Sequence, residues 1–479
     1  MGIWRPVSFL GRTLIDIVVV TAVILFIPGL PPYVSFEPFS LTPALPFTGK
    51  LALNNKLSHA KPLLKDSILG PESIAIRGDE LYTGIIGGNV VRYKNGKMDV
   101  VTKFGKDCEG QWEETKCGRP LGMRFGPNGR LVVADAYYGL FSVDVDTGKV
   151  EMLVSTNDTI DGKQPRNPND LDIGKDGTIY WSDSSTNVVL QDATIEFFGE
   201  PSGRLLKYDP RTKSSTVLMR EIHFANGVQL SQNEDFVLVS ETAKSRVLRY
   251  YLTGTKKGSQ DIFIDGLPGS PDNIRSNGKG RIYLSLVAPR YSNKLGIMDK
   301  LGPYPLVRKF LLRLMCLVKA ILSGIQAVGS IEYVDKAQYW LGHLELAASL
   351  FPRHGLVLEL DEAGAIISSF QSAEGKVGSI SEFSIDDEGK YAYLGSPYNK
   401  CIWKETQVKM FNVLNLKHFQ QQNSLSNEYS DVELNHVSSG HNDDLDLIRG
   451  LAAVAVDHAR SKVCEEFIRK DPMQSKPFT

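Results

Sequence analysis

The residues with the clearest chemical meaning in this sequence are oxygen-bearing side chains at the starts of predicted β-strands. They are Glu72, Asn169, Asn226, Asp272 and Asn273. Two carboxylates and three amides supply the hard oxygen ligands that Ca²⁺ prefers, and Ca²⁺ takes about six to eight of them, with water completing the shell. Cysteine and histidine are missing from these positions, which argues against zinc or copper. Any one of the five could instead cap a turn through local backbone bonds, but their recurrence at equivalent positions favours a calcium site.

Two further carboxylates are candidates for a catalytic role. Asp135, in the segment VVADAYY, could act as a general base, and Asp183, in YWSDSS, could support the metal from behind its ligands. Both stand at the ends of predicted strands, where a carboxylate more often serves the structure. His343 and His354 flank the end of a predicted helical segment and could approach the same site.

The sequence lacks the motifs of several large enzyme classes. No GxSxG elbow, phosphate-binding glycine loop or dinucleotide fingerprint occurs in the chain. The formal net charge is −1, so the chain presents no net positive field toward nucleic acid. Serine hydrolase chemistry, nucleotide-dependent chemistry and nucleic-acid binding are therefore not expected.

An internal repeat brings the oxygen-bearing residues together. Each copy has alternating apolar residues, a tight turn and a second β-rich run, usually followed by two more strand-like runs. The copies span residues 71–85, 120–135, 169–183, 225–241, 271–286 and 380–396. A sandwich would not repeat one hairpin six times, and a β-helix would use a far shorter period. The sequence therefore predicts an all-β, six-bladed β-propeller over residues 61–404, whose innermost strands carry the five residues into a central tunnel.

One segment interrupts the fifth predicted blade. Residues 304–350 contain VRKFLLRLMCLVKAILSGIQAVG, which is helical by composition and spacing. The lysines and arginines within it argue against a second membrane span. It could form a lid over the propeller, a helix on the membrane surface, or a helix packed on the propeller's side. After the propeller, residues 405–479 are interpreted as a polar linker and a C-terminal helix.

The N-terminus carries a targeting signal. Residues 14–31 are almost wholly apolar, with Asp16 as their one charge, and a helix of about 20 such residues crosses a bilayer. The alternatives are a cleaved signal peptide or a buried core helix. No small-residue cleavage site is obvious, because Pro28, Gly29 and two further prolines follow the run directly. We therefore expect a transmembrane signal-anchor at residues 14–31.

Flanking charge predicts the orientation of this anchor. Arg5 and Arg12 precede the apolar run, and the nearest basic residue after it is Lys50. The positive-inside rule then places residues 1–13 in the cytosol. We expect a single-pass type II protein held in membrane lipid, with a stem at residues 32–60. Its body would lie in the lumen of the endoplasmic reticulum or outside the cell, in the secretory pathway or at the plasma membrane.

Cysteine usage fits an oxidising compartment. Cys108 and Cys117 lie close together in the loop CEGQWEETKC, and a disulfide there would close a small loop. A zinc site is less consistent with the sequence, because neither a histidine nor a CxxC pair lies nearby. Asn157 begins an N-x-[ST] sequon, so we expect glycosylation there on the luminal side.

Three longer segments give the chain a family resemblance: CGRPLGMRFGPNGRLVVADAYYGL, FANGVQLSQNEDFVLVSET and LPGSPDNIR. Residues 71–404 resemble the calcium-dependent six-bladed propellers that include paraoxonases, regucalcin-type lactonases and strictosidine synthases. The likeness is strongest to the strictosidine synthase-like branch and extends to the anchor and the helical insertion. It implies that Glu72, Asn169, Asn226, Asp272 and Asn273 hold a catalytic Ca²⁺. It also implies arylesterase-like hydrolysis of esters or lactones, in which the ion polarises the carbonyl and stabilises the oxyanion.

The sequence departs from the paraoxonase pattern at two places. Paraoxonases have a histidine where this chain has Leu121 and a second one near Asp135, so their histidine dyad is absent. Ser73 follows Glu72 where their second, structural calcium would need an acid, although Asp170 remains.

The sequence also departs from the strictosidine synthases. Their catalytic glutamate in the last blade is replaced by Ser379, and Glu382 lies three residues further on. Their condensation reaction is therefore not expected.

Two functions are consistent with these observations. The first is a membrane-anchored, calcium-dependent hydrolase that acts on small apolar esters or lactones in the tunnel. The second is a non-catalytic binding or scaffold propeller in which the ion is structural. The complete ligand set favours the enzyme, whereas the missing dyad favours binding.

Overall fold

The computed structural model describes residues 4–329, 331–348 and 352–406, with side chains from Gly11 onward. Helix α1 (Trp4–Phe26) begins earlier than the predicted span at 14–31 and ends at Phe26, because Pro28 and Gly29 do not continue a helix. The predicted linker begins at residue 405, but residues 405 and 406 still belong to the last strand of the body, and the rest of the linker and the C-terminal helix lie outside the described residues.

Six antiparallel sheets of four strands each make up the body. The first two are β2 (Ile74–Arg77), β3 (Glu80–Gly84), β4 (Asn89–Lys94), β5 (Lys97–Lys103), then β6 (Pro120–Phe125), β7 (Leu131–Asp135), β8 (Gly139–Val143), β9 (Val150–Ser155). The next two are β10 (Pro168–Ile173), β11 (Ile179–Asp183), β12 (Gly203–Asp209), β13 (Ser214–Ile222), then β14 (Ala225–Leu230), β15 (Phe236–Glu241), β16 (Arg246–Tyr251), β17 (Gln260–Ile264). The last two are β18 (Gly269–Ser276), β19 (Arg281–Pro289), β20 (Gly355–Asp361), β21 (Ile366–Ser372), then β22 (Glu382–Ile385), β23 (Tyr391–Gly395), β24 (Ile402–Thr406), β1 (Lys61–Leu63).

The six sheets form a closed ring. Their first strands contact one another in the order β2, β6, β10, β14, β18 and β22, and β22 returns to β2. The last sheet joins the two ends of the ring, because β1 pairs with β24 and places Lys61 opposite Lys404. Each of the six predicted hairpins forms the first two strands of a sheet. The predicted all-β architecture of six four-stranded blades is confirmed.

Apolar side chains fill the space between neighbouring blades. Trp181 on β11 is fully buried and packs with Ala134 and Leu140 of the preceding blade. Similar clusters lie between the other blades, because alternate residues of each strand point to opposite faces of its sheet. This packing holds neighbouring blades together and positions the innermost strands around the axis of the ring.

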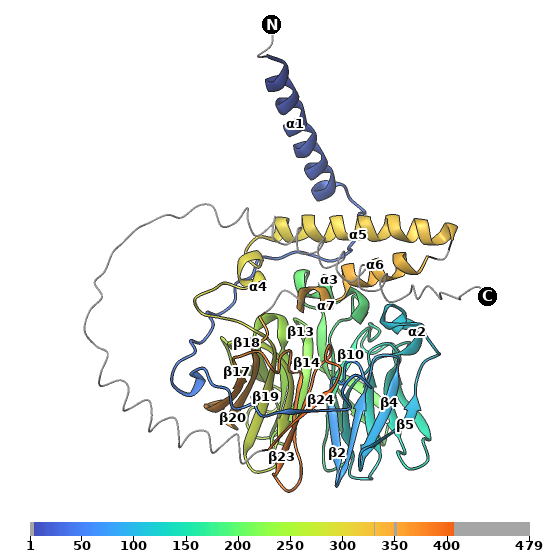
Figure 1. The fold of residues 1–479 in the computed structure, drawn as a ribbon, viewed down its shortest axis with the longest axis vertical. Coiled ribbons are helices and arrows are strands. Elements are labelled where there is room, and N and C mark those ends of the chain that lie inside the picture. The colour runs from blue at the N-terminus through green and yellow to red at the C-terminus, as the bar shows by residue number, and fades with distance from the viewer. Residues whose placement is uncertain (1–3, 330, 349–351, 407–479) are drawn as a thin grey trace, which may run out of the picture. The chain divides into compact units, whose positions relative to one another are not determined.

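Helices gather on one side of the sheets (Figure 1). Short helices α2 (Glu114–Cys117) and α3 (Ala193–Phe198) lie in loops between strands. Four more occupy the connection between β19 and β20, which runs from residue 290 to 354: α4 (Ile297–Leu301), α5 (Pro305–Val328), α6 (Glu332–Gly342) and α7 (Glu345–Ala348). This insertion in the fifth sheet is longer than the predicted 304–350. Its smaller helices carry no long apolar repeat that the sequence could have shown.

Candidate functional site

The predicted ligands stand at interruptions of the innermost strands. In β10, β14 and β18 the pairing with the second strand skips residues 169–170, 226–227 and 272–273. Such β-bulges release side chains from the regular alternation and redirect them. The bulges in this chain hold Asn169, Asn226, Asp272 and Asn273, and Glu72 lies just before β2.

The five predicted ligands form one buried group, here called the oxygen cluster (Glu72, Asn169, Asn226, Asp272 and Asn273). Each is at most 5% exposed. The Asn273 side-chain amide donates a hydrogen bond to Glu72 Oε1 at 2.8 Å, which joins the first and fifth sheets. The Asn226 amide bonds to the Asp272 carboxylate and joins the fourth and fifth. The structure therefore brings the predicted ligands together from separate blades.

The oxygen cluster contains buried oxygens without partners. Glu72 Oε2 and the side-chain carbonyl oxygens of Asn169, Asn226 and Asn273 have no hydrogen-bond partner among the described residues. A buried polar atom without a partner costs free energy unless something binds it. Burial, together with Asp170 and Glu382, raises the pKa of Glu72 to about 8, and burial beside Glu72 raises the pKa of Asp272 well above its usual value. Two such acids become stable anions only when a positive charge reaches them.

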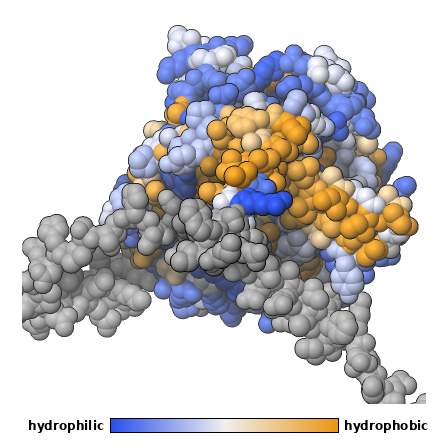
Figure 2. All heavy atoms as spheres, turned by 90° about the horizontal axis from the view of Figure 1, so that it is seen from above, coloured by the Kyte–Doolittle hydropathy of each residue, from blue (hydrophilic) through white to orange (hydrophobic). Residues whose placement is uncertain are grey.

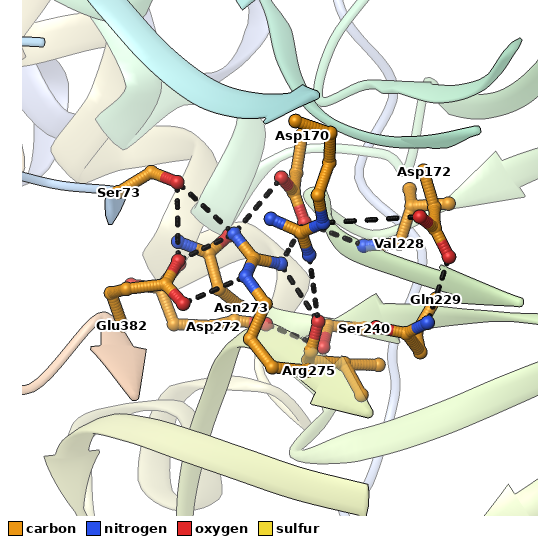
Figure 3. Close-up of polar contacts among 12 residues, drawn as sticks. Ser73, Asp170, Asp172, Val228, Gln229, Ser240, Asp272, Asn273, Arg275 and Glu382 are labelled. Carbon is orange, nitrogen blue, oxygen red and sulfur yellow. Dashed lines mark hydrogen bonds and ion pairs between the residues drawn. The ribbon is translucent and has the colours of Figure 1, made fainter. Parts of the chain in front are cut away.

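A second polar group lies directly beside the first and is called the arginine cluster (Ser73, Asp170, Arg275 and Glu382; Figure 3). Arg275 donates to Asp170 Oδ2 at 2.8 Å, to Glu382 Oε1 at 2.7 Å and to Ser73 Oγ at 3.1 Å. Burial would lower the pKa of Arg275, but Asp170 and Glu382 outweigh it and raise that pKa above its ordinary value. This cluster carries its own cation and has no unpaired side-chain oxygen among the described atoms.

A cavity of about 90 Å³ opens beside the oxygen cluster. Its polar wall includes Glu72, Asn169, Asn226 and Asp272, and its other walls include Leu121, Phe197, Phe224, Tyr339 and Leu344. A separate cavity of about 560 Å³ includes Arg275 in its wall, together with residues from the far ends of the innermost strands. The arginine cluster therefore lies between the two cavities. Among the described residues, no group of three or more histidine, cysteine, aspartate or glutamate side chains has metal-binding geometry. The oxygen cluster differs from such groups because amides supply three of its five side chains.

Two known protein families match parts of this chain. The strictosidine synthase family matches residues 169–255, and the N-terminal family described as strictosidine synthase-like matches residues 49–93. Bovine adipocyte plasma membrane-associated protein is 37% identical over 81% of this chain and 90% of its own length. The chain belongs to the family of the adipocyte plasma membrane-associated proteins. The strictosidine synthase-like resemblance predicted from the sequence is confirmed.

Other relatives and solved structures extend the comparison. The chicken adipocyte plasma membrane-associated protein is 39% identical over 75% of this chain and 81% of its own length. The Drosophila melanogaster protein called hemomucin is 37% identical over 79% of this chain, which spans 66% of the fly protein. A gluconolactonase structure from Xanthomonas campestris covers 79% of this chain and 98% of its own, at 16% identity and a TM-score of 0.47. The names of the bovine, chicken and fly relatives associate those proteins with the plasma membrane.

Glu114 is a candidate site residue that the sequence did not reveal. It lies on α2, is 1% exposed, and contributes to the wall of the same cavity as the oxygen cluster. Burial raises its pKa to about 7, although a hydrogen bond from the Tyr137 hydroxyl lowers it in part. His343 Nε2 lies 3.6 Å from Glu114 Oε1, and burial lowers the pKa of His343 to about 3, so this histidine is neutral. A carboxylate that titrates near neutrality can accept a proton.

A disulfide positions Glu114. The predicted Cys108–Cys117 bond is present and closes the loop that contains α2. The composition of this loop is charged and predicts a solvated segment. The one signal in the sequence that Glu114 faces inward is the predicted disulfide, which holds the loop next to the first strand of a blade.

The two predicted catalytic carboxylates lie away from the cavity wall. Asp135 is fully buried, and its Oδ1 accepts the backbone N–H groups of Tyr137 and Tyr138. Burial raises its pKa to about 7, but it is not among the residues that form either cavity. Asp183 is paired with Arg204 at 2.8 Å and accepts the backbone N–H of Asn167. Both carboxylates hold local structure here, so we do not propose a catalytic role for either.

The two histidines near the insertion differ. His343 lies in the cavity wall, whereas His354 bonds to Tyr291 and Gln371. Asn157, the predicted glycosylation site, is exposed on the turn after β9, and its modification stays a prediction.

Proposed function

We propose that this chain is a calcium-dependent hydrolase of small apolar esters or lactones, held in a membrane by α1. The observation that carries this proposal is the set of four buried oxygens that have no partner among the described residues, three of them on residues that line one cavity. The donor chemistry suits a hard divalent cation, because carboxylates and amide carbonyls are its preferred ligands. Glu72 and Asp272 would supply the negative charge, and the three asparagines would supply neutral oxygens.

The chain's own residues can support hydrolysis around that ion. When bound, Ca²⁺ would polarise a carbonyl and favour the developing oxyanion. Glu114, which lines the same cavity and has a pKa of about 7, would take a proton from water there. Phe197 and Phe224 present an apolar surface to the substrate, and Leu121 adds to it where a paraoxonase has histidine.

Membrane anchoring through α1 is the second part of the proposal. Its apolar side chains from Leu14 to Phe26 are mostly exposed, as a lipid-facing helix requires. Arg5 and Arg12 precede the apolar run, so the body would lie in the lumen or outside the cell. The disulfide fits the same compartment. The names of the relatives support a membrane location.

Hydrolysis of phenyl acetate by the full chain in detergent tests the enzyme. We expect turnover with calcium and none after chelation. Asn226→Ala should abolish turnover because it removes one of the unpartnered oxygens. Asn187→Ala is the matched control, because Asn187 is exposed and is not among the residues of the cavity wall. Equal turnover in the wild type and Asn226→Ala would contradict the proposal.

The pH profile tests the role of Glu114. We expect kcat/KM to rise as pH passes about 7, because Glu114 must lose its proton to act as a base. Glu114→Gln should flatten this rise and lower kcat by about 10²- to 10⁴-fold, the usual contribution of a general base. Calcium binding should persist in the variant. An unchanged profile would remove Glu114 from the mechanism.

A non-catalytic binding propeller is the second candidate function. Leu121 favours it, because an apolar side chain lies in the cavity wall where the paraoxonase resemblance calls for histidine. A folded, calcium-stabilised protein without esterase or lactonase turnover would support this candidate over the hydrolase.

A further inference from the structure

Helix α5 carries a continuous apolar stripe on its exposed face. The stripe consists of residues spaced alternately four and three apart, which places them on one side of a helix. They are Val307, Leu311, Leu314, Val318, Ile321, Ile325 and Val328, each at least 38% exposed. In the view from above, onto the side from which α1 projects and on which α5 lies, hydrophobic residues gather into one large patch (Figure 2). A patch of this kind marks an interaction surface.

Basic side chains away from the stripe attach α5 to the rest of the protein. Three of its four basic residues point inward. Arg308 is fully buried and donates to the carbonyl oxygens of Leu301 and Phe198. Lys319 pairs with Asp192 at the end of a 3₁₀ turn. Arg308 and Lys319 thus attach α5 to loops of the propeller, and the apolar stripe is left facing outward.

These contacts also argue against α5 as a second membrane span. By length and mean hydropathy, α5 is also long and apolar enough to cross a bilayer. A crossing helix would have to carry Arg308, Arg313 and Lys319 into lipid and lose their partners, which is costly. The prediction against a second span therefore agrees with the inward contacts of these residues.

Contacts between α5 and the end of α1 indicate where the membrane surface lies relative to α5. Arg313 on α5 lies 2.9, 3.1 and 3.0 Å from the carbonyl oxygens of Ile24, Leu25 and Ile27. A cation at this end of α1 satisfies carbonyls that the helix itself leaves open. The place where α1 leaves the bilayer is thus fixed on α5. A helix in contact with that exit point, with an apolar stripe that the described residues leave exposed, meets the lipid surface.

We infer that α5 lies in the plane of the membrane, with its apolar stripe inserted among the lipid headgroups and upper acyl chains. The partner is the lipid bilayer that also holds α1. The inference rests on the proposed anchoring through α1 and does not depend on hydrolysis.

The same arrangement brings the bilayer close to the cavity. Helix α5 packs against α3 and α6. Those two helices contribute Phe197 and Tyr339 to the cavity wall. If the chain is a hydrolase, its substrates are therefore lipophilic molecules that partition into the membrane beside α5.

Quenching of single fluorescent labels in liposomes tests this inference with the full chain. Labels are placed at Ile321→Cys on the stripe, Val19→Cys in α1 and Val100→Cys on β5, with the three cysteines outside the disulfide replaced. Val100 is the control, because it is apolar and 61% exposed on an outer strand of the propeller. We expect the labels at positions 19 and 321 to be quenched by brominated lipid and protected from aqueous iodide, and the label at 100 to show the reverse.

Each other outcome has a defined meaning. Iodide quenching at position 321 equal to that at 100, with position 19 protected, would overturn the in-plane helix and keep the anchor. Exposure of position 19 to iodide would overturn both the membrane anchor α1 and the in-plane helix α5. Shielding of position 321 from lipid and iodide alike would indicate a second copy of the chain on the stripe and overturn the lipid assignment. Turnover of phenyl acetate in the same liposomes reports hydrolysis separately.

A substitution provides a second test. Ile321→Glu adds a charge to the exposed stripe without removing a buried contact, so the fold should be retained. We expect it to raise KM for a long-chain ester dissolved in the liposomes and to leave kcat/KM for phenyl acetate unchanged. Equal effects on the two substrates would contradict a membrane-facing role for the stripe.

Discussion

The oxygen cluster and the arginine cluster are neighbours built from the same strands, and they handle buried charge in opposite ways. Glu72 belongs to one and Ser73 to the other, and Asn169 and Asp170 are divided in the same manner. In the arginine cluster the guanidinium of Arg275 saturates Asp170 and Glu382. In the oxygen cluster four buried oxygens have no partner among the described residues. The difference indicates that the buried oxygens of the arginine cluster are paired within the protein, whereas those of the oxygen cluster are paired by a ligand.

The comparison also explains a departure noted in the sequence. The family resemblance implies a second, structural calcium that involves Asp170, and Ser73 stands where that calcium would need an acid. In this chain Arg275 supplies the positive charge to Asp170, and Ser73 Oγ accepts a hydrogen bond from it. A serine at position 73 suits this cluster better than a third carboxylate would, because Asp170 and Glu382 already bring two negative charges to one buried cation.

Arg275→Met should have the largest effect on stability. The change leaves Asp170 and Glu382 buried without a cation, and breaking a buried ion pair from one side costs about 3–5 kcal/mol. Chemical unfolding of the calcium-free protein measures the loss. Arg211→Met, at an exposed pair with Asp209, is the control and should be indistinguishable from the wild type. A small loss for Arg275→Met would mean that the arginine cluster is not self-sufficient.

The pH dependence of the calcium-free protein should be the next largest effect. The pKa of Glu72 is raised to about 8 in the folded chain, so the folded state holds its proton more tightly than the unfolded state. The corresponding stability is fully present below the unfolded pKa and is lost as pH rises through about 8, for a total on the order of a few kcal/mol. Saturating calcium should remove this slope, because the ion stabilises the carboxylate.

Thermal unfolding between pH 5 and pH 8.5, with and without calcium, measures this dependence. Glu72→Gln in the calcium-free protein is the control and should lack most of the slope. The same slope in the variant would assign it to another acid and weaken the account of the oxygen cluster.

Asn226→Ala should have a smaller effect on stability that depends on calcium. Without the ion we expect a loss of about 1 kcal/mol, because the removed oxygen has no partner to lose. A ligand at one hundred times its dissociation constant stabilises the folded state by about 2.7 kcal/mol, and this gain should vanish in the variant. Melting temperatures measured with and without calcium give both quantities. A calcium gain equal to that of the wild type would place the ion elsewhere.

Local patterns were sufficient to predict the propeller and the members of the oxygen cluster. Each hairpin is encoded by alternation and turn residues within about 15 positions, and the ring follows from repeating it. Asn169, Asn226 and Asp272 could be found because they recur at the same point of that repeat. The bulges that point them into the tunnel are not visible in the pattern, because a bulge is defined by its partner strand.

The remaining site residues depend on contacts between distant segments. Arg275 and Glu382 are separated by more than one hundred positions, and neither residue alone signals a pair. Glu114 becomes a candidate base only when the disulfide loop folds against the cavity and removes it from water. Asp183 shows the same dependence, because its position at a strand end suggests chemistry and its pairing with Arg204, 21 positions away, is not visible in the local pattern.

Calorimetric titration of calcium into the full chain, purified in detergent and stripped of metal, tests the central claim most directly. We predict one calcium site at pH 7, with release of protons from the acids of the oxygen cluster. The binding heat should disappear in Asn226→Ala and remain in Asn187→Ala. Absence of calcium binding by the folded wild-type protein, or binding that is unchanged in Asn226→Ala, would contradict the claim that the oxygen cluster is completed by a divalent cation.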